Sequence, residues 1–228
     1  MVNSAGRLYK TIKFHHAVQL FETGKLYLAR PETWEDPYET RLKHEDFNRV
    51  YAQCWCGSGV SDAMWRIYSA DHLGVRIGTS TKKLRKALEA GAKHRGINCW
   101  AKSFDYLSPA DLATKSKELA STWKKNGASI LECSEILRYK REAYKHENEF
   151  RVVLIDNSRN YSLHNKGLQI DVDPFALIDS ILIDPRAPKE LADALVHYFK
   201  TKIGFKRKCQ QSVLYKRPLD LNINSLAE

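Results

Sequence analysis

The chain has 228 residues, 43% of them hydrophobic and 28% charged, with a formal net charge of +10. This length is enough for a single domain, residues 1–228, whose apolar core needs no disulfide bonds or metal ions. No apolar run approaches the roughly 18 residues of a membrane-spanning helix. No secretory signal is visible at the amino terminus, so we expect a cytoplasmic protein without a membrane partner.

The cysteines are odd in number and irregularly spaced, which argues against both a disulfide framework and a zinc site. Free cysteine is among the most buried residue types, so we interpret the thiols as small apolar groups in the core. We therefore predict that the protein holds no metal. The residues concerned are Cys54, Cys56, Cys99, Cys133 and Cys209.

The amino-terminal segments predict a strand, a helix and a second strand. Residues 8–14 are β-prone, and residues 15–23 carry a helix-like apolar cluster with Gly24 as its carboxy-terminal cap. Residues 26–39 then combine an apolar stretch with two prolines and several acids. This composition predicts a strand that enters an irregular loop, and Trp34 lies in that loop.

The middle of the chain predicts three more strands and a helix. Residues 50–56, 74–79 and 97–103 read as strands, while residues 81–90 are rich in helix formers. The clearest helix start follows the third of these strands.

Ser108 stands at the N-cap of that helix, with Pro109 at its first position and Asp111 near the positive end of the dipole. We expect the helix to run to about Asn126, where Gly127 ends it.

The carboxy-terminal third supplies the strongest strand candidates, residues 149–156, 168–173 and 180–184. Two prolines at 185 and 188 open a last helix that runs through residue 200, and residues 211–215 add a closing strand. Strands and helices mix without strict alternation. This order favours an α+β fold with a mixed or antiparallel central sheet flanked by helices.

Glu147 and Glu149 are the first candidates for chemistry. Two carboxylates two residues apart at the start of a strand point the same way, because side chains alternate faces. One can hydrogen-bond a ribose hydroxyl and stabilise a developing oxocarbenium ion, while the other orients or deprotonates the nucleophile. The alternative is a charged strand start with both acids in water, paired with Lys145 or Arg151.

Aromatic and basic residues form a second set of candidates. Trp65 and Tyr68 are three residues apart in a helical turn and can form one aromatic wall, which suits a nicotinamide or a base. Lys10, next to Tyr9 on the first strand, can donate to a ribose hydroxyl or a phosphate. The alternatives are core packing for the aromatic pair and a solvent-facing lysine. No Walker loop, GxGxxG or HExxH motif is present.

A basic segment at about residues 200–217 contains no acid. It predicts a surface that can hold a nucleic acid, against the alternative of a solvated basic face. Its charge gives non-specific affinity that salt weakens. The nucleic-acid contacts are expected from Lys200, Lys202, Lys206, Arg207 and Lys208.

Taken in order, these segments resemble a bacterial and phage domain family of unknown function. The resemblance rests on LYK at 8–10, LFETGKLYLARPETWEDPYE at 20–39, MWRIY at 64–68 with GVRIG at 74–78, and ENEFR at 147–151. It spans about residues 8–215. Five ordered motifs are much more specific than any one of them.

That family is in turn similar to ADP-ribosyltransferases, which implies an ADP-ribosyltransferase-like fold with NAD as the substrate. In such enzymes a basic or histidine residue on the first strand contacts the NAD ribose. The resemblance implies this position for Lys10, beside Tyr9, although lysine lacks the planar fork of arginine.

The resemblance further implies that Trp65 and Tyr68 pack on the nicotinamide. It also implies that Glu149 acts on the ribose, with Glu147 completing the pair. Trp34, on its proline-stiffened loop, is expected to shield the same cleft from water. The alternative for Trp34 is a loop residue packed onto the core.

The resemblance implies an NAD-dependent ADP-ribosyltransferase, acting as an intracellular toxin or phage-defence effector that modifies nucleic acid or protein. An antitoxin or defence-system protein would then be a further partner. Two alternatives stay open: a non-catalytic nucleic-acid-binding module of the same fold, and an NAD glycohydrolase with water as acceptor. Convergence of the ENE and MWRIY segments on one site would favour the enzyme.

Overall fold

The computed structural model describes residues 6–93, 96–127, 129–158 and 166–218. Its helical segments are α1 (Phe14–Thr23), η1 (Pro31–Thr33), η2 (Glu45–Arg49), α2 (Asp62–Tyr68), α3 (Thr81–Ala92), α4 (Pro109–Asn126), α5 (Ile130–Cys133), η3 (Ser134–Arg138), η4 (Glu142–Glu147), α6 (Pro174–Leu177), α7 (Lys189–His197) and η5 (Tyr198–Lys202). Its strands are β1 (Arg7–Lys13), β2 (Lys25–Ala29), β3 (Val50–Cys56), β4 (Gly74–Ser80), β5 (Ile97–Ser103), β6 (Asp105–Leu107), β7 (Tyr139–Arg141), β8 (Glu149–Asp156), β9 (Gly167–Asp171), β10 (Ser180–Ile183) and β11 (Lys208–Gln211).

Nine of the described strands form one sheet in the order β11-β10-β4-β1-β3-β2-β9, with β8 on β3 and β5 on β8. β8 pairs along the whole of β3. The other edge of β3 meets β1 at Cys56 and β2 at Ala52, so the sheet divides there. Only β10 and β11 run parallel in this sheet. The predicted α+β fold with a mixed, mostly antiparallel sheet is confirmed.

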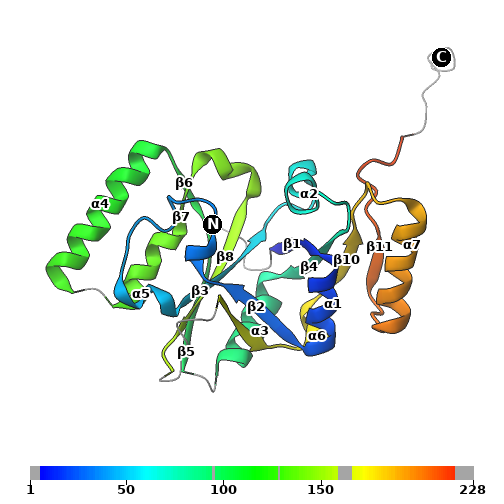
Figure 1. Ribbon diagram of the computed structural model, residues 1–228, viewed down its shortest axis with the longest axis horizontal. Coiled ribbons are helices and arrows are strands. Elements are labelled where there is room, and N and C mark those ends of the chain that lie inside the picture. Colours follow the sequence, from blue (N-terminus) through cyan, green and yellow to red (C-terminus); the bar gives the residue numbers. More distant parts are fainter. Residues whose placement is uncertain (1–5, 94–95, 128, 159–165, 219–228) are drawn as a thin grey trace, which may run out of the picture.

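Strand β8 is buried along its whole length because helices and loops cover both faces of the sheet around it. Phe150, Val152 and Leu154 point into a core under α1, α3 and α7. Val153 and Ile155 point the other way, into a smaller core beneath α4, α5 and η3. Figure 1 shows α4, α5 and the separate β6–β7 pair at one end of the molecule, with α7 and β11 at the other.

Local signals set several boundaries as predicted. Gly24 ends α1 in the left-handed conformation with φ 63° and donates its N–H to Leu20. Helix α4 begins at Pro109 after a Ser108 cap, whose hydroxyl accepts the Asp111 N–H at 3.1 Å. No described helix combines the length and apolar character needed to cross a membrane.

The closing strand differs from its prediction. It occupies β11, residues 208–211, rather than 211–215. Cys209 in β11 inserts into the core, whereas Val213 and Tyr215 of the predicted strand remain 63% and 45% exposed. The buried state expected of the thiols is likewise wrong for Cys99, which is exposed on β5.

The Ser108 cap gives a stability test. Ser108→Ala leaves amide groups of the first turn of α4 without their acceptor, so we expect a loss of about 1 kcal/mol in unfolding free energy. Ser108→Gly should lose only a few tenths of a kcal/mol. Urea unfolding of both variants measures the difference, and equal stability of Ser108→Ala and the wild type would contradict a stabilising cap.

Candidate active site

Glu147 and Glu149 meet at a sharp turn between η4 and β8. Glu147 ends η4 and Glu149 begins β8, while Asn148 between them adopts a left-handed conformation with φ 41°. The turn is fixed by two hydrogen bonds, from the Gly57 N–H to the Asn148 carbonyl at 2.8 Å and from Asn148 Nδ2 to Ser58 Oγ at 3.1 Å. The two carboxylates therefore converge through this turn, not through the alternation of a continuous strand.

Both carboxylates share the ammonium group of Lys140 on β7. Lys140 Nζ donates to Glu147 Oε2 at 2.6 Å and to Glu149 Oε2 at 3.0 Å, and it lies 3.2 Å from Glu39 Oε1. Burial lowers the pKa of Lys140, but the three carboxylates outweigh burial and raise it, so the ammonium stays charged. The alternative that both acids remain in water is wrong, because Glu147 and Glu149 are 7% and 4% exposed.

Arg151 binds the other side of Glu149. Its Nε and Nη2 donate to Glu149 Oε1 at 3.0 and 2.9 Å, and Nη2 also donates to Glu39 Oε2 at 2.8 Å. The guanidinium carbon lies 4.1 Å from the Trp34 ring centroid and 4.2 Å from that of Phe104. Glu39 therefore bridges the two cations, and two aromatic rings hold the arginine in place.

The two glutamates have opposite electrostatic character. Burial opposes ionisation of Glu149, but Arg151 and Lys140 outweigh it and hold the pKa of this carboxyl at about 2. Burial is the largest influence on Glu147 and raises its pKa, despite Lys140. With Glu39, three carboxylates face two cations, which leaves one negative charge. Glu147 is the group best able to take up the balancing proton.

Hydrogen-bonding capacity separates the glutamates in the same way. Glu149 accepts from Arg151 twice, from Lys140 and from the Cys54 thiol, which fills the roughly four acceptor positions of a carboxylate. Glu147 accepts from Lys140 and, at 3.3 Å, from the Tyr68 hydroxyl. Glu147 thus retains acceptor capacity that a substrate hydroxyl can use.

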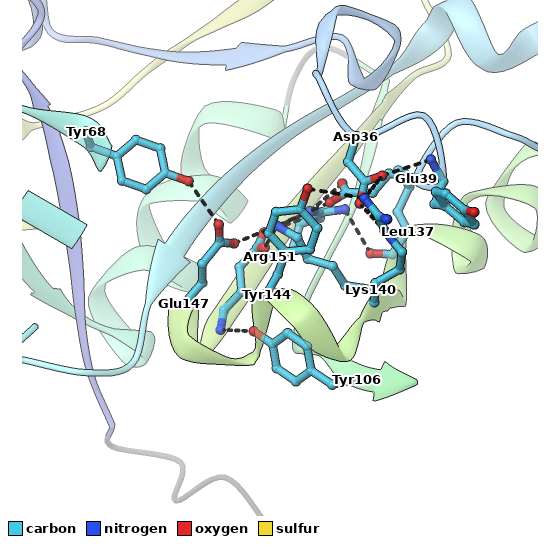
Figure 2. A network of polar contacts seen from close by, with 12 residues as sticks. Asp36, Glu39, Tyr68, Tyr106, Leu137, Lys140, Tyr144, Glu147 and Arg151 are labelled. Carbon is cyan, nitrogen blue, oxygen red and sulfur yellow. Dashed lines mark hydrogen bonds and ion pairs between the residues drawn. The ribbon is translucent and has the colours of Figure 1, made fainter. Parts of the chain in front are cut away.

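Tyr68 connects this cluster to α2 (Figure 2). Its side chain reaches across to Glu147, while 43% of the residue stays exposed. Burial of the hydroxyl and the nearby Glu147 charge raise the pKa of Tyr68, so it remains a neutral hydrogen-bond donor. The MWRIY and ENE segments therefore meet, through Tyr68 and Glu147.

The other candidates lie around this contact. Lys10 Nζ donates to the Cys54 carbonyl at 2.8 Å, and burial lowers the pKa of Lys10 while the Glu149 charge opposes that effect. Trp34 lies against Arg151, which is two positions after Glu149 and binds it. Trp65 is only 1% exposed, with the Arg76 guanidinium 5.6 Å from its ring centroid.

Tyr9 shares that guanidinium, which lies 4.9 Å from its ring centroid. Trp65 and Tyr9 therefore pack around Arg76 in this structure, and Tyr68 is the residue of the aromatic pair that reaches the glutamates.

Several residues of the site were not selected from the sequence. Glu39 follows Pro31 and Pro37, and these prolines predict an exposed loop. They give no indication of the buried ion pair that Glu39 forms with Arg151. The sequence suggests Arg151 only as a pairing partner of solvated acids. No sequence pattern marks Lys140 or Tyr106 as a site residue. Only the fold places Lys140 between the two glutamates. Only the fold brings the Tyr106 hydroxyl within 2.7 Å of the Glu149 N–H, which donates to this hydroxyl.

A cavity of about 650 Å³ opens beside the cluster. Phe104 and Tyr106 form part of its wall, and the same residues contact Arg151 and the Glu149 amide. The remaining lining residues are Asp105, Leu107, Lys115, Tyr139, Glu142 and Lys145. The ion cluster is thus separated from open space by single aromatic side chains.

Comparison with known proteins adds a family match and a structural likeness. Residues 64–152 match the model of a protein family of unknown function, DUF2971, and this segment includes Tyr68, Lys140, Glu147, Glu149 and Arg151. A comparison with curated proteins finds no significant match.

The solved structures that resemble the chain include DarT from Thermus sp. 2.9. The complex of DarT with NAD+ has a TM-score of 0.44 and 13% identity, over 94% of this chain and 100% of that one. The complex with ADP-ribosylated ssDNA has a TM-score of 0.43 and 11% identity, over 91% and 94%. The complex with carba-NAD+ has a TM-score of 0.39 and 16% identity, over 92% and 97%.

Removal of the shared ammonium tests the ion cluster. Lys140→Met leaves three buried carboxylates without this cation, so we expect a loss of about 3–5 kcal/mol in unfolding free energy at pH 7. Burial then raises the pKa of Glu147 in the folded variant with no Lys140 to oppose it, so protonation of this carboxyl favours folding. The loss should shrink as the pH falls towards about 4, as measured by urea unfolding.

The wild type should behave in the opposite way, because the lowered pKa of Glu149 contributes stability above pH 4.5 that is lost as the pH falls towards about 2. Lys102→Met is the matched control, since Lys102 forms an exposed pair with Glu135 at 3.2 Å. It should cost at most about 1 kcal/mol. A loss for Lys140→Met that does not vary with pH would contradict the shared-cation interpretation.

Proposed function

We propose that this protein is an NAD-dependent enzyme of the ADP-ribosyltransferase type, which cleaves the nicotinamide glycosidic bond and transfers ADP-ribose to an acceptor. The observation that carries the proposal is the buried Glu147–Glu149 pair, held by Lys140 and reached from α2 by the Tyr68 hydroxyl. A pair of carboxylates with different charge states at one point fits a reaction that needs both a fixed negative charge and a base.

The two carboxylates divide the reaction. When the bond between the ribose C1′ and the nicotinamide nitrogen breaks, its electron pair leaves with nicotinamide, and positive charge develops on the ribose. Glu149 remains ionised and supplies the negative charge that stabilises this oxocarbenium-like state. The acceptor then forms a new bond to C1′ and gives up a proton, which Glu147 can accept because its raised pKa favours protonation.

The surrounding side chains suit the binding of a dinucleotide. Tyr68 exposes ring area next to Glu147 and is our candidate for the nicotinamide contact. Trp65 belongs to the same helix but packs against Arg76, and Lys10, with Tyr9 beside it on β1, offers a donor for a ribose hydroxyl or a phosphate. Trp34 covers Arg151 and would limit the access of water to the reacting bond.

The carboxy-terminal basic segment favours a nucleic-acid acceptor. Its candidate contacts are exposed in the structure, and they are Lys200, Lys202, Lys206, Arg207 and Lys208. A protein acceptor, or water as in an NAD glycohydrolase, would use the same carboxylate pair. The same surface would serve a non-catalytic nucleic-acid-binding module. A role as a toxin or phage-defence effector, with an antitoxin or defence-system partner, follows from the family resemblance and completes the proposal.

Neutralisation of each glutamate tests the division of work. Glu147→Gln should reduce transfer to an acceptor by a factor on the order of 10² to 10³, and reduce NAD hydrolysis less. Glu149→Gln should abolish both, because it removes the charge opposite the developing cation. Labelled NAD is incubated with purified protein, with and without cellular RNA, DNA or protein. Glu190→Gln, at an exposed glutamate of α7, is the matched control and should hydrolyse NAD like the wild type.

Folding is checked by melting temperature, since Glu149→Gln also weakens two ion pairs. Tyr68→Phe provides a variant without that complication, because it removes one partly exposed hydroxyl. Folded Glu149→Gln protein as active as the wild type would make this glutamate a structural charge. Wild-type protein that never consumes NAD would exclude the enzyme and leave the binding module.

The basic surface is tested by charge removal. Replacement of Lys202, Lys206 and Lys208 by glutamine should weaken binding to single-stranded RNA and DNA, and lower the slope of log affinity against log salt by about one per lysine that contacts a phosphate. NAD hydrolysis without acceptor should not change. Replacement of the exposed α4 lysines Lys117, Lys124 and Lys125 is the control. Equal weakening by both triple variants would show that the affinity follows net charge alone.

A further inference from the structure

The position of Tyr68 depends on a helix that cannot hold itself in place. Helix α2 has seven residues, and Tyr68 is its last. A helix of this length is unstable by itself in water, because the cost of nucleation is not recovered over two turns. Contacts from elsewhere in the chain must therefore fix the angle at which Tyr68 approaches Glu147.

Arg186 makes such a contact at the end of α2. Its Nη2 donates to the carbonyl of Trp65 at 2.8 Å and to that of Ser69 at 2.7 Å. Trp65 lies in the last turn of α2 and Ser69 is its C-cap, and their carbonyls also accept the Ser69 and His72 N–H groups at 3.0 and 3.1 Å. A cation at this end also interacts favourably with the helix dipole. The Arg186 guanidinium thus binds backbone carbonyls on both sides of Tyr68.

The guanidinium is itself fixed by Asp184. Asp184 is 0% exposed and accepts from Arg186 Nε at 3.1 Å and from Nη2 at 2.8 Å. The Asp184 N–H donates to the Gly74 carbonyl at 3.1 Å, directly after β10. The main sheet is therefore connected through Asp184 and Arg186 to the end of α2.

The first residue of α2 is held from the same part of the chain. The Tyr215 hydroxyl hydrogen-bonds the Asp62 carboxylate, which also accepts from Arg66 at 2.7 Å. Tyr215 is 45% exposed, whereas Asp184 is fully buried, so the Arg186 contact is the more rigid of the two. Contacts from residues 184–215 thus reach both ends of a helix that lies more than 100 positions earlier in the sequence.

We infer that Arg186 is a positioning residue for the site: by binding the Trp65 and Ser69 carbonyls it sets the end of α2 so that the Tyr68 hydroxyl reaches Glu147. Its contribution to catalysis rests on the proposed function. Its effect on the Tyr68–Glu147 contact does not, and can be measured without NAD.

A double-mutant cycle tests the inference in turnover. Tyr68→Phe removes a hydrogen bond to a carboxylate and should slow NAD turnover about tenfold to a hundredfold. Arg186→Met, which keeps the stem but loses the donors, should slow it by a similar factor. If Arg186 acts through Tyr68, the double variant is no slower than Tyr68→Phe alone. Multiplied effects, or full activity of Arg186→Met, would overturn the inference.

The titration of the Glu147 carboxyl, followed by ¹³C NMR, is the readout that needs no substrate. Loss of a hydrogen bond to the ionised form raises the pKa of a carboxyl group. Tyr68→Phe and Arg186→Met should therefore both raise the pKa of Glu147. The double variant should show the same pKa as Tyr68→Phe alone. A shift in Tyr68→Phe but not in Arg186→Met would also overturn the inference. If the wild type fails to turn over NAD, the proposed function fails and this titration still decides the role of Arg186.

Two further variants control for folding and for general effects. Arg186→Lys keeps the positive charge but cannot donate two hydrogen bonds in the same planar geometry. Its Glu147 pKa and its activity should therefore lie between those of Arg186→Met and the wild type. It replaces Arg186→Met in the test if that variant does not fold. Arg85→Met removes another arginine that donates to a backbone carbonyl, that of Ala101 at 2.9 Å. It should leave the Glu147 titration at the wild-type value.

Discussion

Three carboxylates and two cations share one buried volume, and the rest of the site depends on their mutual compensation. Glu39, Glu147 and Glu149 are each less than 9% exposed, as are Lys140 and Arg151. Removal of such groups from water is costly, and the cost is offset only when each charge faces an opposite charge at hydrogen-bonding distance. The loop before β3, strand β7, the end of η4 and the start of β8 must therefore meet at one point (Figure 2).

Because the cluster has one more carboxylate than cations, it can hold a fixed negative charge and also bind or release a proton. Glu149 is saturated with donors and stays ionised, so it acts as a fixed charge. Glu147 has fewer donors and a raised pKa, so a proton can be gained or lost there with little disturbance of the other ion pairs. A functional difference between two neighbouring glutamates thus arises from their partners, since the residue type is the same.

The site also links parts of the chain that are distant in sequence. Trp34 and Phe104 enclose the Arg151 guanidinium, and Phe104 is at the same time part of the wall of the adjoining cavity. Tyr68 extends the cluster towards solvent, and Arg186 ties the helix that carries Tyr68 to the sheet. Aromatic side chains from three separate segments therefore surround the ion cluster, and contacts outside their own elements hold them there.

The sequence by itself determined most strands of the main sheet and the longer helices, and it named both glutamates. Apolar periodicity, the Ser108 cap and Gly24 mark boundaries through local backbone and packing preferences, which act over a few residues. The ENEFR motif indicated Glu147 and Glu149 for the same reason, as they are neighbours along the chain. Residue order also predicted the α+β class.

Only the tertiary structure decided which groups share the site. The Lys140 ammonium group, on β7, lies within hydrogen-bonding distance of both glutamates. Trp65 is buried against Arg76, whereas Tyr68 of the same helix reaches Glu147. Residues 212–215 lie beyond the end of β11, the strand that carries the buried Cys209. Ion pairing and burial depend on distance in space, and local sequence preferences do not encode contacts between residues more than 100 positions apart, such as Arg151 with Glu39.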